Sequence, residues 1–190
     1  MLILAACGEN EATKELDAKD TEKAEAKTEE NASESKKDES EEDEDIWTYY
    51  EDANWEGTWE GLKFTIQKAV VSDKAPQIVD GEEIIGSAVG VKMQVENTTA
   101  DKVYTTYPDQ ATLVTSTGEQ VEADMWVSDD LGGDIHEGVI KEGNVIFYLE
   151  RGNAEAIEWI KLTWSNSYSD PDGNYENDQY QDQEVKLQLK

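Results

Sequence analysis

Between residues 46 and 190, apolar and polar residues alternate one by one in a series of short segments. Alternation with a period of two places apolar side chains on one face of a β-strand and polar side chains on the other. No segment in this range keeps the period of an amphipathic helix. The alternating segments are 62–66, 89–95, 121–127, 144–150, 160–164 and 185–189. The pattern predicts an all-β domain.

Turn-forming residues fall between the alternating segments. The turn signals are Val79-Asp80-Gly81, 96–99, Thr117-Gly118, Gly132-Gly133, 142–144 and 151–153, and we expect one helical turn within 153–158. The 145 residues from Ile46 to Lys190 are enough for one domain with its own core. We therefore expect residues 46–190 to form an antiparallel β-sandwich of about seven or eight strands.

Residues 8–45 have a different composition. They contain no aromatic residue and one large aliphatic residue, Leu16, and they end in the acidic run Glu41-Glu42-Asp43-Glu44-Asp45. A segment this polar cannot bury enough apolar surface to offset the entropy lost on folding. We expect a disordered acidic tether that separates the folded domain from residues 1–7.

The charge of the chain excludes some classes of partner. The formal net charge is −29, and both parts are acidic: residues 8–45 carry 17 acidic and 6 basic residues, and the remainder carries 28 and 10. Binding to nucleic acid requires Lys and Arg to neutralise phosphates, so we expect no nucleic-acid partner. The same acidity argues against direct docking on anionic lipid or an anionic wall polymer, unless divalent cations bridge the charges.

The only cysteine lies in Leu4-Ala5-Ala6-Cys7-Gly8. This stretch resembles the lipobox of bacterial lipoproteins. The resemblance implies that a signal peptidase cuts before Cys7, whose thiol then carries an acyl anchor of the palmitate type. We expect the chain to be held at the extracytoplasmic face of the cell membrane; the alternative is a free or buried cysteine near a chain end.

Residues 1–7 match a lipobox better than they match a whole signal peptide. No Lys or Arg precedes Cys7, and the apolar run covers only Met1 to Ala6, whereas signal peptides begin with a basic region and a longer apolar run. We expect residues 1–7 to be a truncated signal peptide whose natural start lies upstream. No other stretch has the roughly 20 apolar residues of a membrane-spanning helix.

Three blocks in the domain resemble a known family. They are the strand and Asn turn at 89–98, the strand and Gly turn at 111–119, and the segment 138–147, where two glycines precede a strand. Their order is similar to that in the immunoglobulin-like domain of Gram-positive secreted lipoproteins, catalogued as domain of unknown function 4352. The match covers about 60–165 and departs at His136-Glu137, where the family often has proline. It implies an immunoglobulin-like sandwich and an extracytoplasmic location, and it supplies no catalytic residues.

Aromatic residues at 46–60 and at 126 are candidate ligand contacts. Trp47, Trp55 and Trp59 stand among Asp, Asn and Glu residues, a combination suited to sugars, whose C–H faces stack on aromatic rings. The alternative is a strap that packs its rings onto an open end or edge of the sandwich. Trp126 alternates out of phase with the apolar residues of 121–127, which predicts an exposed ring.

The best metal candidate is an acidic loop between two expected strands. Alternate oxygen-bearing side chains could converge on Ca²⁺; they are Asp170, Asp172, Asn174, Glu176 and Asp178. The glycine that a helix-loop-helix calcium loop requires is replaced by Tyr175, so the alternative is a solvated acidic loop. A weaker cluster consists of Asp129, Asp130 and Asp134. Apart from this calcium, we expect no cofactor.

Catalytic patterns are weak in this chain. His136 is the only histidine, and with Cys7 lipidated it has no cysteine partner and no nucleophile-elbow sequence nearby. We therefore predict a non-enzymatic, monomeric binding or scaffolding module, with binding through 46–60, 128–138 or 166–182. Its expected partner is an extracytoplasmic protein or a wall glycan. The alternatives are a wall-polysaccharide binder that uses the 46–60 strap and a calcium-stabilised adhesion-type domain.

Overall fold

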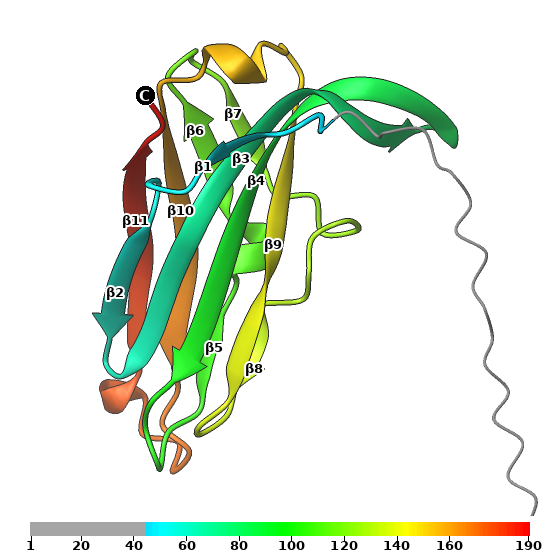
Figure 1. Cartoon of the computed structure of the whole chain (residues 1–190). Coiled ribbons are helices and arrows are strands. Elements are labelled where there is room, and N and C mark those ends of the chain that lie inside the picture. Colours follow the sequence, from blue (N-terminus) through cyan, green and yellow to red (C-terminus); the bar gives the residue numbers. More distant parts are fainter. Residues whose placement is uncertain (1–44) are drawn as a thin grey trace, which may run out of the picture. The chain divides into compact units, whose positions relative to one another are not determined.

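The structure, a computed structural model, describes residues 45–190 (Figure 1). These residues form two antiparallel β-sheets packed face to face, which confirms the predicted all-β sandwich. Within residues 45–190 the only helices are single 3₁₀ turns, and none is long or apolar enough to cross a membrane. The expected tether and Cys7 lie outside the described residues.

The first sheet is built on one long hairpin. Its strands are β1 (Thr48–Tyr50), β2 (Trp55–Trp59), β3 (Leu62–Val79), β4 (Glu82–Asn97) and β9 (Ile140–Leu149), in the order β1-β3-β4-β9. Strands β1 and β2 share one edge of β3: Tyr49 pairs with Val70 and Gly57 pairs with Phe64. The aromatic segment 46–60 is therefore an edge strand in two pieces, as one of the two sequence interpretations expected.

The second sheet is centred on β10. Its strands are β5 (Tyr104–Thr106), β6 (Thr112–Thr115), β7 (Gln120–Glu122), β8 (Gly133–Ile135), β10 (Trp159–Tyr168) and β11 (Gln179–Gln188). One edge of β10 pairs with β11 and the other with β6 and then β5. The 3₁₀ turns are η1 (Pro108–Gln110), η2 (Ala154–Ala156) and η3 (Tyr175–Asn177). The second of them confirms the helical turn expected within 153–158.

The core lies between the inner faces of the two sheets. Alternating residues of β3, β4, β9 and β10 are buried, as their period-2 pattern predicts. Trp164 is 3% exposed and meets the edge of the Phe64 ring at 5.3 Å between ring centroids. Burial of one large apolar side chain contributes about 1.5–3 kcal/mol, so contacts of this kind supply most of the stability of a chain whose only cysteine lies outside this domain.

Eleven strands lie within residues 45–190, where seven or eight were expected. The additional strands are short pieces such as β1, β5 and β8, which have too few residues to show alternation. The strand expected over 121–127 ends at Glu122, because the chain leaves the second sheet there and Asp124 donates its N–H to Ile146 in the first. The turn expected at 142–144 is wrong, since Gly143 lies inside β9.

The β3–β4 hairpin extends beyond the sandwich. Asp80 and Gly81 form its two-residue turn, both with positive φ, as the sequence predicted. Asp73 and Lys74 lie opposite the single residue Ser87, which is a β-bulge, and a bulge bends and twists its strand. Figure 1 shows the ribbon arching away from the body beyond this point. We call residues 73–87 the arched hairpin.

Asp73 fixes the base of the arched hairpin. Its carboxylate accepts hydrogen bonds from Ser87 Oγ (2.6 Å), the Ala154 N–H (2.6 Å) and the Glu155 N–H (3.3 Å). Burial raises the pKa of Asp73, but these hydrogen bonds outweigh it and hold the pKa below its ordinary value. The ionised form is therefore stabilised by folding.

Replacement of Asp73 by Asn should destabilise the domain in a pH-dependent way. Because the folded-state pKa is lowered, the stabilisation is present above the unfolded pKa of about 4 and is lost as the pH falls through the folded value. We expect Asp73→Asn to lower the free energy of unfolding by about 1–3 kcal/mol at pH 7. Urea denaturation at pH 7 and pH 3 measures this, with Asp182→Asn on exposed β11 as control. An equal loss at both pH values would contradict the role of charge.

Candidate functional site

The outer face of the first sheet carries a groove of about 370 Å³, which we call the first hollow. It crosses four strands at positions that alternate with buried core residues. Its lining residues are Trp47, Tyr49, Lys68, Val70, Gly90, Lys92, Val127, Asp129, Asn144 and Ile146. Aromatic, aliphatic, cationic and amide groups thus surround one space on the surface of a strongly acidic domain.

Gly90 forms the floor of the first hollow. A Cβ atom at this position would lie 2.8 Å from Val70 Cγ2 and 3.3 Å from Ile146 Cδ1, so only glycine lets these two side chains close over the strand. The floor is therefore apolar. Its depth depends on the absence of a side chain at the centre of β4.

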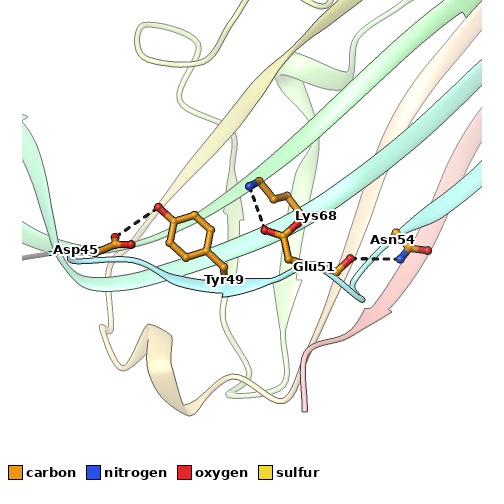
Figure 2. A network of polar contacts seen from close by, with 5 residues as sticks. All are labelled: Asp45, Tyr49, Glu51, Asn54 and Lys68. Carbon is orange, nitrogen blue, oxygen red and sulfur yellow. Dashed lines mark hydrogen bonds and ion pairs between the residues drawn. The ribbon is translucent and has the colours of Figure 1, made fainter.

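One wall of the first hollow is the aromatic edge strand β1. Tyr49 Oη lies 3.4 Å from Asp45 Oδ1, and Lys68 Nζ lies 3.2 Å from Glu51 Oε1 and 5.0 Å from the centre of the Tyr49 ring. Figure 2 shows Tyr49 reaching toward Asp45 while Lys68 turns toward Glu51. Tyr49 remains 47% exposed, so its ring can still contact a ligand.

The opposite wall is the segment 124–129, which runs along the free edge of β9. The Asp129 carboxylate accepts from the Asn144 N–H at 2.7 Å and from Asn144 Nδ2 at 3.3 Å. A Cβ atom on Gly143 would lie 2.4 Å from Asp129 Cβ, which explains a glycine inside a strand. This wall is thus held by packing against β9 as well as by hydrogen bonds.

Lys92 is the second cation of the first hollow, and it is paired with Glu142. Lys92 Nζ lies 2.9 Å from Glu142 Oε1, and Gln67 Nε2 lies 2.8 Å from Glu142 Oε2. Both donors lower the pKa of Glu142. The ammonium group is therefore held at the sheet surface, close to Asn144.

A larger groove, the second hollow, lies between the arched hairpin and segment 124–127. Its volume is about 680 Å³, and its lining residues are Pro76, Gln77, Ile78, Glu83, Asp124, Trp126, Val127 and Tyr148. Trp126 is 96% exposed, and its backbone N–H donates a hydrogen bond to Asp124 Oδ1 at 2.9 Å. Since Val127 lines both hollows, they adjoin along the outer face of the first sheet.

The four predicted tryptophans have different places in the structure. Trp47 lines the first hollow and Trp126 the second. Trp55 and Trp59 pack against the core, where Trp55 meets Trp164 at 6.2 Å and Trp59 meets Tyr104 at 5.6 Å between ring centroids. Trp126 is exposed as expected, but it lies on a turn and not on a strand.

The acidic loop between β10 and β11 uses its oxygens to hold its own backbone. Asp170 Oδ1 accepts from the Asp172 N–H, Asp178 Oδ1 from the Asp170 N–H, and Asn174 Oδ1 from the Glu176 N–H. Within residues 45–190, no three acidic, His or Cys side chains converge as metal ligands. The structure therefore does not bring together the five residues expected to bind Ca²⁺.

Sequence reasoning missed most of the residues that complete the two hollows. Tyr49, Lys68, Lys92 and Tyr148 occupy outward strand positions and look like ordinary solvated residues in the sequence. The only signal was that several outward positions of β3 and β9, such as Val70 and Ile146, are apolar.

No protein-family model matches this chain, and no curated protein matches it in sequence. Its structure is similar to that of a functionally unknown protein from Listeria monocytogenes EGD-e, with a TM-score of 0.47 and 12% identity over 76% of this chain and 88% of that one. It is also similar to a conserved hypothetical protein from Bacillus anthracis, with a TM-score of 0.45 and 12% identity over 76% and 98% of the two chains.

Two tryptophan substitutions should separate packing from surface exposure. We expect Trp55→Ala to lower the free energy of unfolding by about 2–4 kcal/mol, because its ring packs against Trp164 and the core. Trp126→Ala should change it by less than about 0.5 kcal/mol, since almost all of its ring is in solvent. Urea denaturation of both variants tests this, and a large loss in Trp126→Ala would mean that its ring is packed.

Proposed function

We propose that this protein is a lipid-anchored extracytoplasmic lipoprotein whose sandwich acts as a non-enzymatic binding module. The observation that carries the binding role is the outer face of the first sheet, where two hollows adjoin at Val127. Around them lie exposed apolar residues, among them Ile78, Met125 and Trp126. Contiguous exposed apolar groups on a highly charged protein usually mark an interaction site.

The anchoring role rests on the sequence. The lipobox at 4–8 supplies an acylation site at Cys7, and residues 8–45 supply a polar spacer of 38 residues. Along the chain, these 38 residues separate the proposed acylation site from the start of the domain.

Loss of Cys7 should release the protein from the membrane. When the chain is expressed in a Gram-positive host behind a complete lipoprotein signal peptide, wild type should partition into the membrane fraction and the detergent phase. Cys7→Ala should appear in the aqueous phase or the medium, because acyl chains supply about 0.8 kcal/mol of membrane affinity per buried CH₂. Trp126→Ala is the control that should stay anchored. Retention of Cys7→Ala in the detergent phase would contradict the anchor.

The first hollow favours wall glycan as one ligand of this module. Trp47 and Tyr49 present aromatic surface, while Asn144 and Lys92 present hydrogen-bond donors in the same space. Sugars combine apolar C–H faces with hydroxyl groups, and this set of groups satisfies both. Of the three strap tryptophans, only Trp47 takes part in this proposal, because Trp55 and Trp59 pack inward.

Titration with soluble peptidoglycan fragments tests the glycan proposal. Calorimetry should detect binding to wild type, and Trp47→Ala should weaken it about tenfold, because stacking against one ring contributes on the order of 1–2 kcal/mol. Trp159→Ala is the matched control, since Trp159 lies in the second sheet with its ring against Lys186. Absence of heat at millimolar fragment, or equal affinity in both variants, would exclude the first hollow as a glycan site.

A further inference from the structure

The two hollows differ in charge. Lys68 and Lys92 line the first hollow together with one carboxylate, Asp129, whereas the second hollow has Glu83 and Asp124 and no basic residue in its lining. A smaller hollow of about 380 Å³ adjoins the second across Trp126, and its lining adds Glu122 and again no Lys or Arg. Trp126 therefore stands between two spaces whose charged groups are all carboxylates.

Apart from Gln77, the rest of the second hollow is lined by apolar and aromatic residues. Pro76 and Ile78 come from the arched hairpin, Val127 and Trp126 from the turn after β7, and Tyr148 from β9. Ile78 is 77% exposed, so little of the protein covers this surface. A ligand that fits must bring apolar surface for these residues and positive charge for Glu83 and Asp124.

The second hollow is preorganised. Asp124 accepts from the Trp126 N–H through Oδ1 and from the Ser128 N–H through its carbonyl oxygen, at 2.9 Å each. Ser128 Oγ in turn accepts from the Ile146 N–H at 2.9 Å. Across the hollow, Tyr148 Oη donates to the Pro76 carbonyl oxygen at 2.9 Å, which holds the arched hairpin against β9. Because these segments are already held in place, binding a ligand loses little conformational entropy of the protein, and this favours affinity.

We infer that the second hollow docks a segment of a partner protein in which a Lys or Arg side chain lies next to a large apolar residue. The cation would lie over the exposed face of Trp126, within reach of Asp124 and Glu83. The apolar neighbour would pack against Ile78 and Val127. A cation placed over tryptophan beside carboxylates gains from both the ring and the charges. This inference rests on the proposed role as a binding module and names the partner chemistry for one of its two hollows.

Charge complementarity selects this occupant over others. Residues 46–190 carry 28 acidic and 10 basic residues, so a second copy of the chain would bring like charge to the carboxylates of the hollow. Nucleic acids and anionic lipids would do the same. A purely apolar segment would fill the space beside Ile78 but would leave Glu83 and Asp124 without a counter-charge.

Three labelled peptides test the inference by fluorescence anisotropy with the folded domain. The probe alternates lysine and leucine and is short enough to stay monomeric. In the second peptide glutamate replaces lysine, and in the third serine replaces leucine. We expect the lysine–leucine peptide to bind at least about tenfold more tightly than either of the others, and its affinity to fall with added salt. Equal binding of the glutamate–leucine peptide, or no binding of the lysine–leucine peptide, would overturn the inference.

Variants then locate the binding. Trp126→Ala should weaken the lysine–leucine peptide about tenfold. Asp124→Asn removes the charge and keeps an oxygen that can accept from the backbone N–H of Trp126. A loss of affinity in this variant would therefore be caused by the lost charge and not by a change in the fold of the turn. Tyr175→Ala is the matched control, because Tyr175 is 86% exposed beside Glu176 but lies outside both hollows. Unchanged affinity in both Trp126→Ala and Asp124→Asn would overturn the inference.

Failure of this inference can be told from failure of the proposed function. Titration with peptidoglycan fragments tests binding in the first hollow through Trp47, and membrane fractionation tests anchoring through Cys7. If both succeed while the lysine–leucine peptide does not bind, the binding module stands and its second hollow has another role.

Discussion

The pairing of β3 with β4 is the constraint on which the rest of this structure depends. The two strands pair along their whole length, from Leu62 opposite Asn97 to Val79 opposite Glu82, with two irregularities in register. Inner positions of this ladder supply core residues such as Phe64 and Met93, and outer positions such as Val70 and Gly90 line the first hollow. β1 and β2 pair along one side of it and β9 along the other. Core and binding face are thus two sides of the same two strands, so a change of register in one would displace the other.

The sequence predicts those strands whose two faces have different surroundings. β3, β4 and β10 alternate between a dry core and water, and period-2 patterning reports that contrast directly. The arched hairpin does not follow this pattern because residues on both of its faces are in solvent: Ile78, Glu83 and Ile85 are all exposed. Residues 124–127 continue the alternation of β7, yet the Asp124 side chain captures the Trp126 N–H and turns the chain toward the other sheet. In the sequence, Gly143 predicts a turn, whereas in the structure it lies within β9 and leaves room for the Asp129 side chain.

The same distinction explains how much of the candidate site could be predicted. Trp47 and Trp126 are conspicuous in the sequence as aromatic residues among acidic ones, but Trp55 and Trp59 have the same surroundings in sequence and pack inward. Lys68, Tyr148 and Glu83 become neighbours of these rings only through strand register and the bend at Asp73, neither of which a single sequence reports. In the acidic loop at 170–178, the carboxylates alternate as calcium ligands would, and in the structure Asp170 and Asp178 accept hydrogen bonds from backbone N–H groups of the loop itself.

The bulge at Asp73 and Lys74 also has a consequence for solubility. Beyond it, β3 and β4 pair with each other and, among residues 45–190, with no further strand, so the ribbon presents two unpaired edges. Such edges are templates for pairing between copies of a protein. The tip carries Asp80, Glu82 and Glu83, so a second copy that paired along this edge would bring carboxylates close to carboxylates. Their repulsion opposes self-association at neutral pH, and it weakens when carboxylates are protonated or salt screens them. The acidity of this domain therefore protects an exposed ribbon from aggregation.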